Sequence, residues 1–108
     1  MKFTFGNSPA ANRLEVLVEE SPIARRQVST LLSIYTNQLL HITGAKDQRT
    51  VHLCMEMLRD NTLRRIDVKR NLTTEMKTYL KNVVVMRYRV YRRGFDDVIN
   101  IANNQKKP

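Results

Sequence analysis

Seven apolar side chains recur at helical spacing between residues 22 and 43, and no other pattern constrains the fold of this chain as strongly. Intervals of three and four residues place them on one side of an α-helix, with polar side chains on the other. Ser21 and Pro22 suit the cap and the first position of a helix, and Gly44 suits its end. The sequence therefore predicts a long amphipathic helix over about 22–43, with its buried side formed by Ala24, Val28, Leu31, Leu32, Tyr35, Leu39 and Ile42.

Two more helices are predicted on either side of this one. The dipeptide Ser8-Pro9 repeats the start signal and predicts a helix over about 9–20. Asp47 is a good N-cap for a third helix, which ends near residues 60–61 or continues to Ile66. Residues 61–71 fit a basic loop, an extension of that helix or a short strand. The apolar side of the third helix consists of Val51, Cys54, Met55 and Leu58.

A fourth helix is predicted from Thr73, its cap, to Gly94, its end. A last short helix capped by Asp96 would follow, before a polar tail at 103–108. The apolar side of the fourth helix comprises Met76, Tyr79, Leu80, Val83, Met86 and Val90. Its opposite side carries Lys77, Lys81, Tyr88, Arg89, Arg92 and Arg93, which we call the basic stripe.

The predicted fold class is mostly α, a small helical domain of four to five helices. It forms a single domain over 1–108, with a flexible N-terminal arm at 1–7. An α+β fold is the alternative, because β-branched and alternating residues also favour strands. Its short sheet would combine residues 2–5, 62–69 and 83–92.

The charge of the chain is concentrated in its second half. The formal net charge is +9, with 19 Lys and Arg against 10 Asp and Glu. Residues 1–58 carry six basic and five acidic side chains, whereas residues 59–108 carry thirteen and five. Such asymmetry indicates a polyanionic partner for the second half, and nucleic acid is the commonest one.

The sequence carries no motif typical of an enzyme or of a cofactor site. Its three glycines are far apart, so they form no phosphate-binding loop, and no Gly-x-Ser-x-Gly motif is present. His41 and His52 fall in different predicted helices, and the single Cys54 has no second Cys for a metal site. We therefore expect no enzymatic activity, no cofactor and no metal.

Neither a leader peptide nor a membrane-spanning stretch is predicted. We expect an intracellular protein, cytoplasmic or nucleoid-associated, with no membrane partner.

The basic stripe points to a nucleic-acid backbone, because guanidinium groups pair with phosphates through paired N–H donors. Lys77, Lys81, Tyr88 and Arg92 would align along roughly 22 Å of helix at about 1.5 Å per residue. Tyr88 would donate a hydrogen bond or stack on a base. DNA is favoured over RNA, because a line of charge fits a regular duplex. A second basic cluster, formed by Arg64, Arg65, Lys69 and Arg70, would extend the stripe.

Arg87 falls on the apolar side of the fourth helix, so a structural role is predicted for it. A buried Arg needs a partner, and the acidic candidates are Glu56, Asp96 and Asp97.

Two further kinds of partner are predicted. A homodimer would double the number of phosphate contacts, and Leu40, Leu53 and Met57, which project off the apolar sides, are candidates for its interface. The rival function is an adaptor or inhibitor that docks its basic face on an acidic protein partner.

Overall fold

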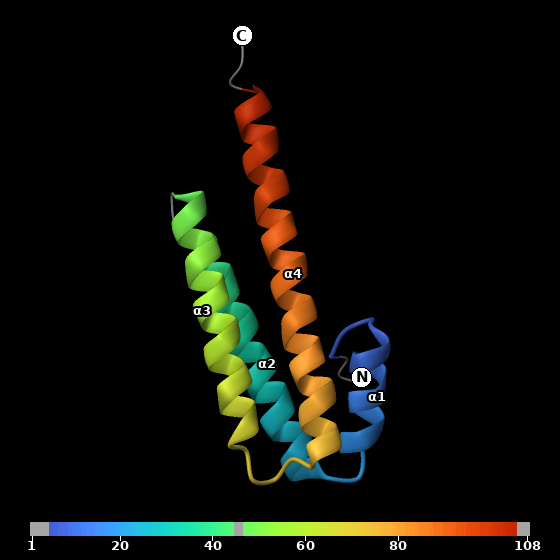
Figure 1. Ribbon diagram of the computed structural model, residues 1–108. Helices are drawn as coiled ribbons and strands as arrows, with labels where there is room; N and C mark the ends of the chain where they lie inside the picture. Colours follow the sequence, from blue (N-terminus) through green and yellow to red (C-terminus); the bar gives the residue numbers. More distant parts are fainter. Residues whose placement is uncertain (1–4, 45–46, 106–108) are drawn as a thin grey trace.

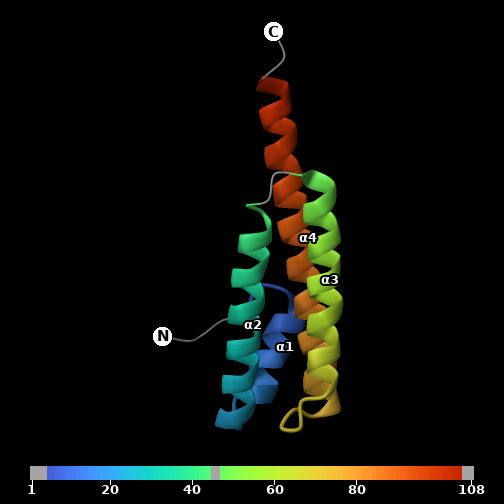
Figure 2. The same ribbon diagram turned by 90° about the vertical axis from the view of Figure 1, so that its left-hand side faces the viewer.

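In the part of the chain that the structure describes, four α-helices run alternately up and down (Figures 1 and 2). The computed structural model describes residues 5–44 and 47–105. The molecule is elongated, 58 × 27 × 18 Å, and the mostly α prediction is confirmed. Over the described ranges no residue lies in a strand, so the α+β alternative is wrong. The helices are α1 (Pro9–Val18), α2 (Pro22–Ile42), α3 (Gln48–Asp67) and α4 (Thr74–Gln105).

Each helix begins where a short side chain caps it. The hydroxyl of Ser8 accepts from the amide of Ala11 at 3.1 Å, and that of Ser21 accepts from Ala24 at 3.3 Å. Asp47 caps α3 in the same way, and Thr73 caps α4. These caps satisfy amide groups that have no partner within the helix. The predicted start signals are confirmed at all four positions.

The last two helices extend further than the shortest helices that the sequence predicts. Residues 61–67 extend α3, which settles the open choice at 61–71 in favour of helix and leaves 68–73 as the connection. The predicted end at Gly94 is wrong, because α4 continues to Gln105. A single helical Gly costs only about 1 kcal/mol relative to Ala. The residues after it are held by α3: the rings of Phe95 and His52 meet edge to face at 6.2 Å.

Asp96 therefore caps no helix. It lies inside α4, where its carboxylate accepts hydrogen bonds from Gln48 at 2.9 Å and from His52 at 2.6 Å. These bonds join the middle of α4 to the beginning of α3.

The core contains side chains from all four helices and from Phe5, which is 1% exposed. The predicted buried side of α2 is confirmed, with Tyr35 at its centre. The Tyr35 hydroxyl donates to the carbonyl of Val84 at 3.2 Å, and burial raises the pKa of the phenol. Phe5, which falls within the arm predicted over 1–7, therefore belongs to the core. Residues 1–4, and 106–108 of the predicted tail, lie outside the described residues, while 103–105 belong to α4.

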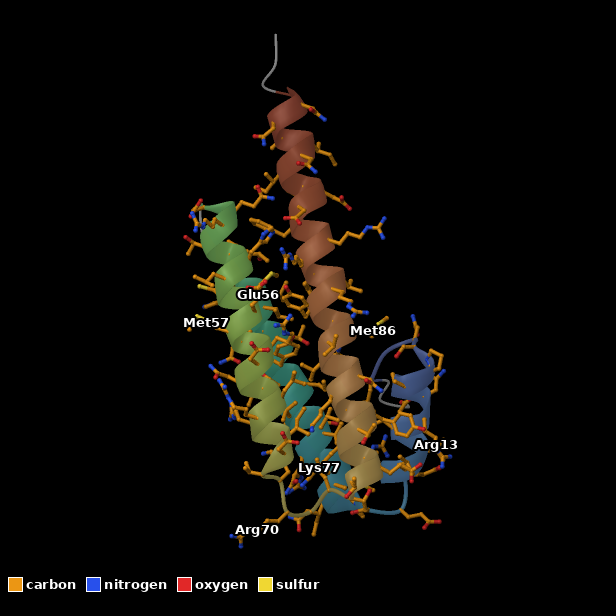
Figure 3. The ribbon with its side chains drawn as sticks, in the orientation of Figure 1. Arg13, Glu56, Met57, Arg70, Lys77 and Met86 are labelled. Atoms are coloured by element: carbon orange, nitrogen blue, oxygen red, sulfur yellow. The ribbon has the colours of Figure 1, made fainter. Side chains whose placement is uncertain are left out.

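The buried side of α4 is rotated relative to the prediction. Val84 and Tyr88 are buried, whereas Met86 and Val90 are 43% and 63% exposed. Figure 3 shows Met86 on the side of α4 where α1 begins. Helix α1 has only ten residues, so it covers the lower part of the predicted apolar side and leaves the upper part open.

Candidate nucleic-acid interface

A basic hollow lies between α2 and α3, near the start of α2 and the end of α3. Its volume is about 270 Å³. Three cations line it, Arg26 from α2, Arg65 from α3 and Lys69 from the connection to α4, and we call it the cation pocket. The other described residues that line it carry no carboxylate: they are Gln27, Thr30, Leu31, Ile34, Tyr35, Gln38 and Thr62.

The antiparallel hairpin of α2 and α3 brings these cations together. The start of α2 lies beside the end of α3 (Figure 2). Arg26 and Arg65 therefore line the same hollow from the two helices. Lys69 follows Arg65 by four residues. Within the described residues, none of the three forms an ion pair. The pocket therefore holds positive charge that the described part of the chain does not neutralise.

The remaining members of the second basic cluster lie close to the pocket in the sequence. Arg64 is exposed beside Asn61, to which it donates a hydrogen bond. Arg70 is exposed in the connection between α3 and α4, and Figure 3 shows its side chain at that end of the bundle.

The basic stripe is divided by the structure. Lys77 and Lys81 face α3 and are held there by Asp67: the Lys77 ammonium donates to its backbone carbonyl at 2.9 Å, and Lys81 forms an ion pair with its carboxylate. Arg89 and Arg93 are exposed on α4. Arg89 lines a shallow hollow beside the start of α1, so it lies on a different side of the bundle from the cation pocket.

Tyr88 and Arg92 belong to a polar seam between α3 and α4. Tyr88 is 6% exposed, so little of its ring is accessible for stacking on a base. Arg59 lies over the Tyr88 ring at 4.5 Å, and Arg92 donates to the Tyr88 hydroxyl. Arg92 also donates to Glu56 at 3.3 Å. The hydrogen bond with Tyr88 is the main cause that raises the pKa of the Arg92 guanidinium.

His52 links this seam to Asp96. Its Nδ1 lies 3.4 Å from the Arg92 guanidinium, and its Nε2 lies 2.6 Å from a carboxylate oxygen of Asp96. Partial burial opposes ionisation of Asp96, but the hydrogen bonds from Gln48 and His52 prevail and lower its pKa. The seam therefore fixes the register of α3 against α4.

Arg87 has the structural role that was predicted, with different partners. Its guanidinium donates to the carbonyl of Phe5 at 2.7 Å, to the hydroxyl of Thr36 at 2.8 Å and to the carbonyl of Leu32 at 3.5 Å. Burial is the main cause that lowers its pKa. The predicted acidic partners are wrong, because Glu56 and Asp96 bind within the seam and no ion pair joins Asp97 to Arg87.

Arg26 is the functional candidate that sequence reasoning missed. The basic residues of the fourth helix are close together in the sequence, so the sequence alone indicates them as a group. The signal for Arg26 lies in the fold: once 22–43 and 48–66 form a helical hairpin, Arg26 must lie opposite the basic end of the second helix.

Comparison with protein-family models, with curated proteins and with solved structures finds no match for this chain. No helix among the described residues is long and apolar enough to cross a bilayer. Within 5–44 and 47–105, no three His, Cys, Asp or Glu side chains group in a way that could hold a metal ion. Cys54 is a free, partly buried thiol.

Proposed function

We propose that this protein binds nucleic acid through the cation pocket, in a regulatory or architectural role and without enzymatic chemistry. The observation that carries the proposal is the convergence of Arg26, Arg65 and Lys69 on one hollow, where the described lining residues include no carboxylate. Like charges repel, so a chain gains nothing for its own stability by collecting them without a counter-charge. A phosphate supplies that counter-charge.

A purely structural explanation accounts for only part of this cluster. Arg64 and Arg65 lie in the last turn of α3, where cations are favourable beside the negative end of the helix dipole. Arg26 lies near the start of α2, which has no acidic residue in its first turn. The dipole does not favour a cation there. Binding of an anion explains both ends of the pocket.

The chemistry of the pocket suits a phosphodiester. Two guanidinium groups can each give paired N–H donors to phosphate oxygens, and the Lys69 ammonium adds a third charge. Thr30 and Gln38 provide further polar groups, and Leu31 and Ile34 form an apolar wall for a sugar. Arg64 and Arg70 would contact neighbouring phosphates.

We favour a duplex over a single strand, and DNA ahead of RNA stays the prediction from the sequence. Single-strand binding relies on exposed aromatic rings that stack on bases. The aromatic ring that lines the pocket belongs to Tyr35, which is 1% exposed, and Tyr88 is buried in the seam. Backbone contacts to a regular duplex require no such ring. The intracellular location, cytoplasmic or nucleoid-associated, accompanies this proposal as a prediction.

A salt titration tests the proposal. Labelled duplex DNA, single-stranded DNA and duplex RNA are compared by fluorescence anisotropy at about 50 and 200 mM salt. If four phosphates are neutralised, affinity for duplex DNA falls by about a hundredfold between these conditions, because counterion release gives a slope of roughly −0.9 per phosphate. Absence of binding at low salt, or an affinity that does not change with salt concentration, would contradict the proposal.

The burial of Tyr88 gives a second prediction. Replacing it with Phe removes the hydroxyl that accepts from Arg92 and keeps the buried ring. We expect affinity for duplex and single-stranded DNA to stay within about twofold of the parent, because the hydroxyl of this buried residue already contacts Arg92 and does not reach a phosphate. The same anisotropy assay measures it. A larger loss of affinity would restore the role of Tyr88 as a hydrogen-bond donor to nucleic acid.

One observation favours the rival function, an adaptor that docks on an acidic protein. The cation pocket shares Ile34 and Gln38 with an apolar hollow of about 530 Å³, which is also lined by Asn37, His41, Ile42 and Leu58. A groove with a basic end and an apolar end fits an amphipathic helix that carries carboxylates at one end. Such binding would weaken less with salt than binding to DNA.

A further inference from the structure

The upper part of α4 presents an apolar face that no other helix of the described residues covers. Figure 1 shows that α4 continues past the ends of α2 and α3, and that α1 stops well below. Along this face, at intervals of three or four residues, Val90, Val98 and Ile101 are 63%, 64% and 57% exposed, and Met86 is 43% exposed. Covering these side chains would remove substantial apolar surface from water.

Gly94 lies in the middle of this face, between Val90 and Val98. It is exposed and helical, and it has no positive φ that would require glycine. Among the described residues, a Cβ atom built on it would meet no side chain and no other helix within 4 Å. Glycine at this position costs about 1 kcal/mol of helix stability relative to alanine. The fold of the described chain therefore gives no reason for it, whereas a second helix that approaches closely would require it.

The charges beside Gly94 are complementary under a two-fold rotation. Arg93 and Asp97 are both exposed, and neither forms an ion pair with a described residue. They share one flank of the apolar face. A two-fold axis near Gly94 sets two copies of α4 antiparallel, so that each Arg93 meets Asp97 of the partner subunit. Residues 98–105 carry no charge, so this part of a strongly basic chain can meet itself without repulsion.

We infer that a second copy of this chain covers the face, through antiparallel packing of the two α4 helices around Gly94. Val90 then packs against Val98 of the partner subunit, and the two glycines face each other at the axis. A two-fold interface must be self-complementary, and this face holds both halves of each contact. The inference does not depend on the cation pocket, which lies between α2 and α3.

The sequence predicts a homodimer, and this inference gives it a specific interface on α4. The interface differs from the one predicted from Leu40, Leu53 and Met57. Leu40 on α2, and Leu53 and Met57 on α3, are 52%, 57% and 58% exposed. Figure 3 shows Met57 on the side of α3 that faces away from α4.

Gly94→Ala separates this inference from a purely intrachain explanation. Alanine improves helix propensity, so the monomer should unfold at a higher temperature. At the interface, the two added methyl groups should hold the helices apart and weaken the dimer at least tenfold. Light scattering after size exclusion, at several protein concentrations, measures the association. A more stable protein with unchanged association would overturn the role of Gly94.

Mixing two charge variants gives the decisive test. Arg93→Asp places acidic groups on both sides of the contact, and Asp97→Arg places basic groups on both sides. We expect the parent chain to be a dimer, each variant alone to be a monomer, and an equimolar mixture of the two to form a heterodimer. A charge contact within one helix would not be repaired by mixing. A monomeric parent chain, or a mixture that stays monomeric, overturns the inference.

Discussion

Reversing the charges of Arg26 and Arg65 together should lower affinity for duplex DNA by about a hundredfold or more. Hydrogen bonds to charged groups contribute about 1.5–3 kcal/mol each. Loss of two such bonds corresponds to about 3–6 kcal/mol, at roughly 1.4 kcal/mol per tenfold change. The measurement is anisotropy of labelled duplex with the Arg26→Glu, Arg65→Glu double variant at fixed salt. Thermal unfolding of the same variant shows whether the fold is kept.

The matched control is the double variant Arg89→Glu, Arg93→Glu. It changes the net charge by the same amount on α4, and Arg89 lies on another side of the bundle. Screening in about 0.1 M salt limits its effect at a distance, so we expect less than a tenfold loss. Equal losses from both variants would mean that binding follows overall charge. A larger loss from the control would place the interface on the exposed part of the basic stripe.

The control also touches the proposed dimer, because Arg93 lies beside its axis. Arg89→Glu alone keeps Arg93 and is therefore tested with it. If the single variant retains affinity and the double variant loses it together with the dimer, the loss comes from dissociation of the dimer. The two proposals thus fail separately.

Replacing Arg87 with Met should give the largest loss of stability of any single basic side chain. The guanidinium is partly buried and joins three acceptors, the carbonyls of Phe5 and Leu32 and the hydroxyl of Thr36. Methionine keeps most of the apolar stem but leaves these acceptors with fewer partners. Each unsatisfied buried group costs about 1–3 kcal/mol. We expect the free energy of unfolding to fall by about 3 kcal/mol.

Denaturant unfolding measures this loss, and Arg89→Met is the control. Arg89 is two residues away on the same helix and is exposed, so its replacement should change stability by no more than about 0.5 kcal/mol. Similar losses at both positions would show that the contacts of Arg87 with Phe5 and α2 contribute little.

The features of the fold that depend on neighbours in the sequence were predictable. The caps of the described helices were predictable because capping joins a side chain to an amide three residues away. The capping residues are Ser8, Ser21, Asp47 and Thr73. The buried side of α2 follows from the spacing of its apolar residues. Capping residues and apolar spacing are both local features, so they can be recognised without knowledge of the tertiary fold.

The orientation of α4 was not predictable in this way. Its apolar residues fit two overlapping sides of the helix. Which side is buried depends on the length of α1, because this helix is too short to bury Met86. The binding of Lys77 and Lys81 to Asp67 depends on the register of α3 against α4. The continuation through Gly94 depends on contacts of the following residues with α3. Each of these is a tertiary property.

In the candidate site, too, features that are local in the sequence were predictable and features that depend on the tertiary fold were not. Arg65 and Lys69 were identified because they are close together in a basic stretch, and they lie in the pocket. Arg26 is far from them in the sequence and was missed. Tyr88 was included for its position among arginines, and packing against α3 buries it.

The measurement that tests the central proposal most directly is an NMR titration of nitrogen-labelled protein with a short DNA duplex. Each backbone amide reports its own surroundings, so the binding surface is mapped without any substitution. The cation pocket predicts the largest shifts at residues 26–30 and 62–70, with small ones at 82–93. Shifts confined to 82–93, or none at the start of α2, would contradict the assignment of nucleic-acid binding to Arg26, Arg65 and Lys69.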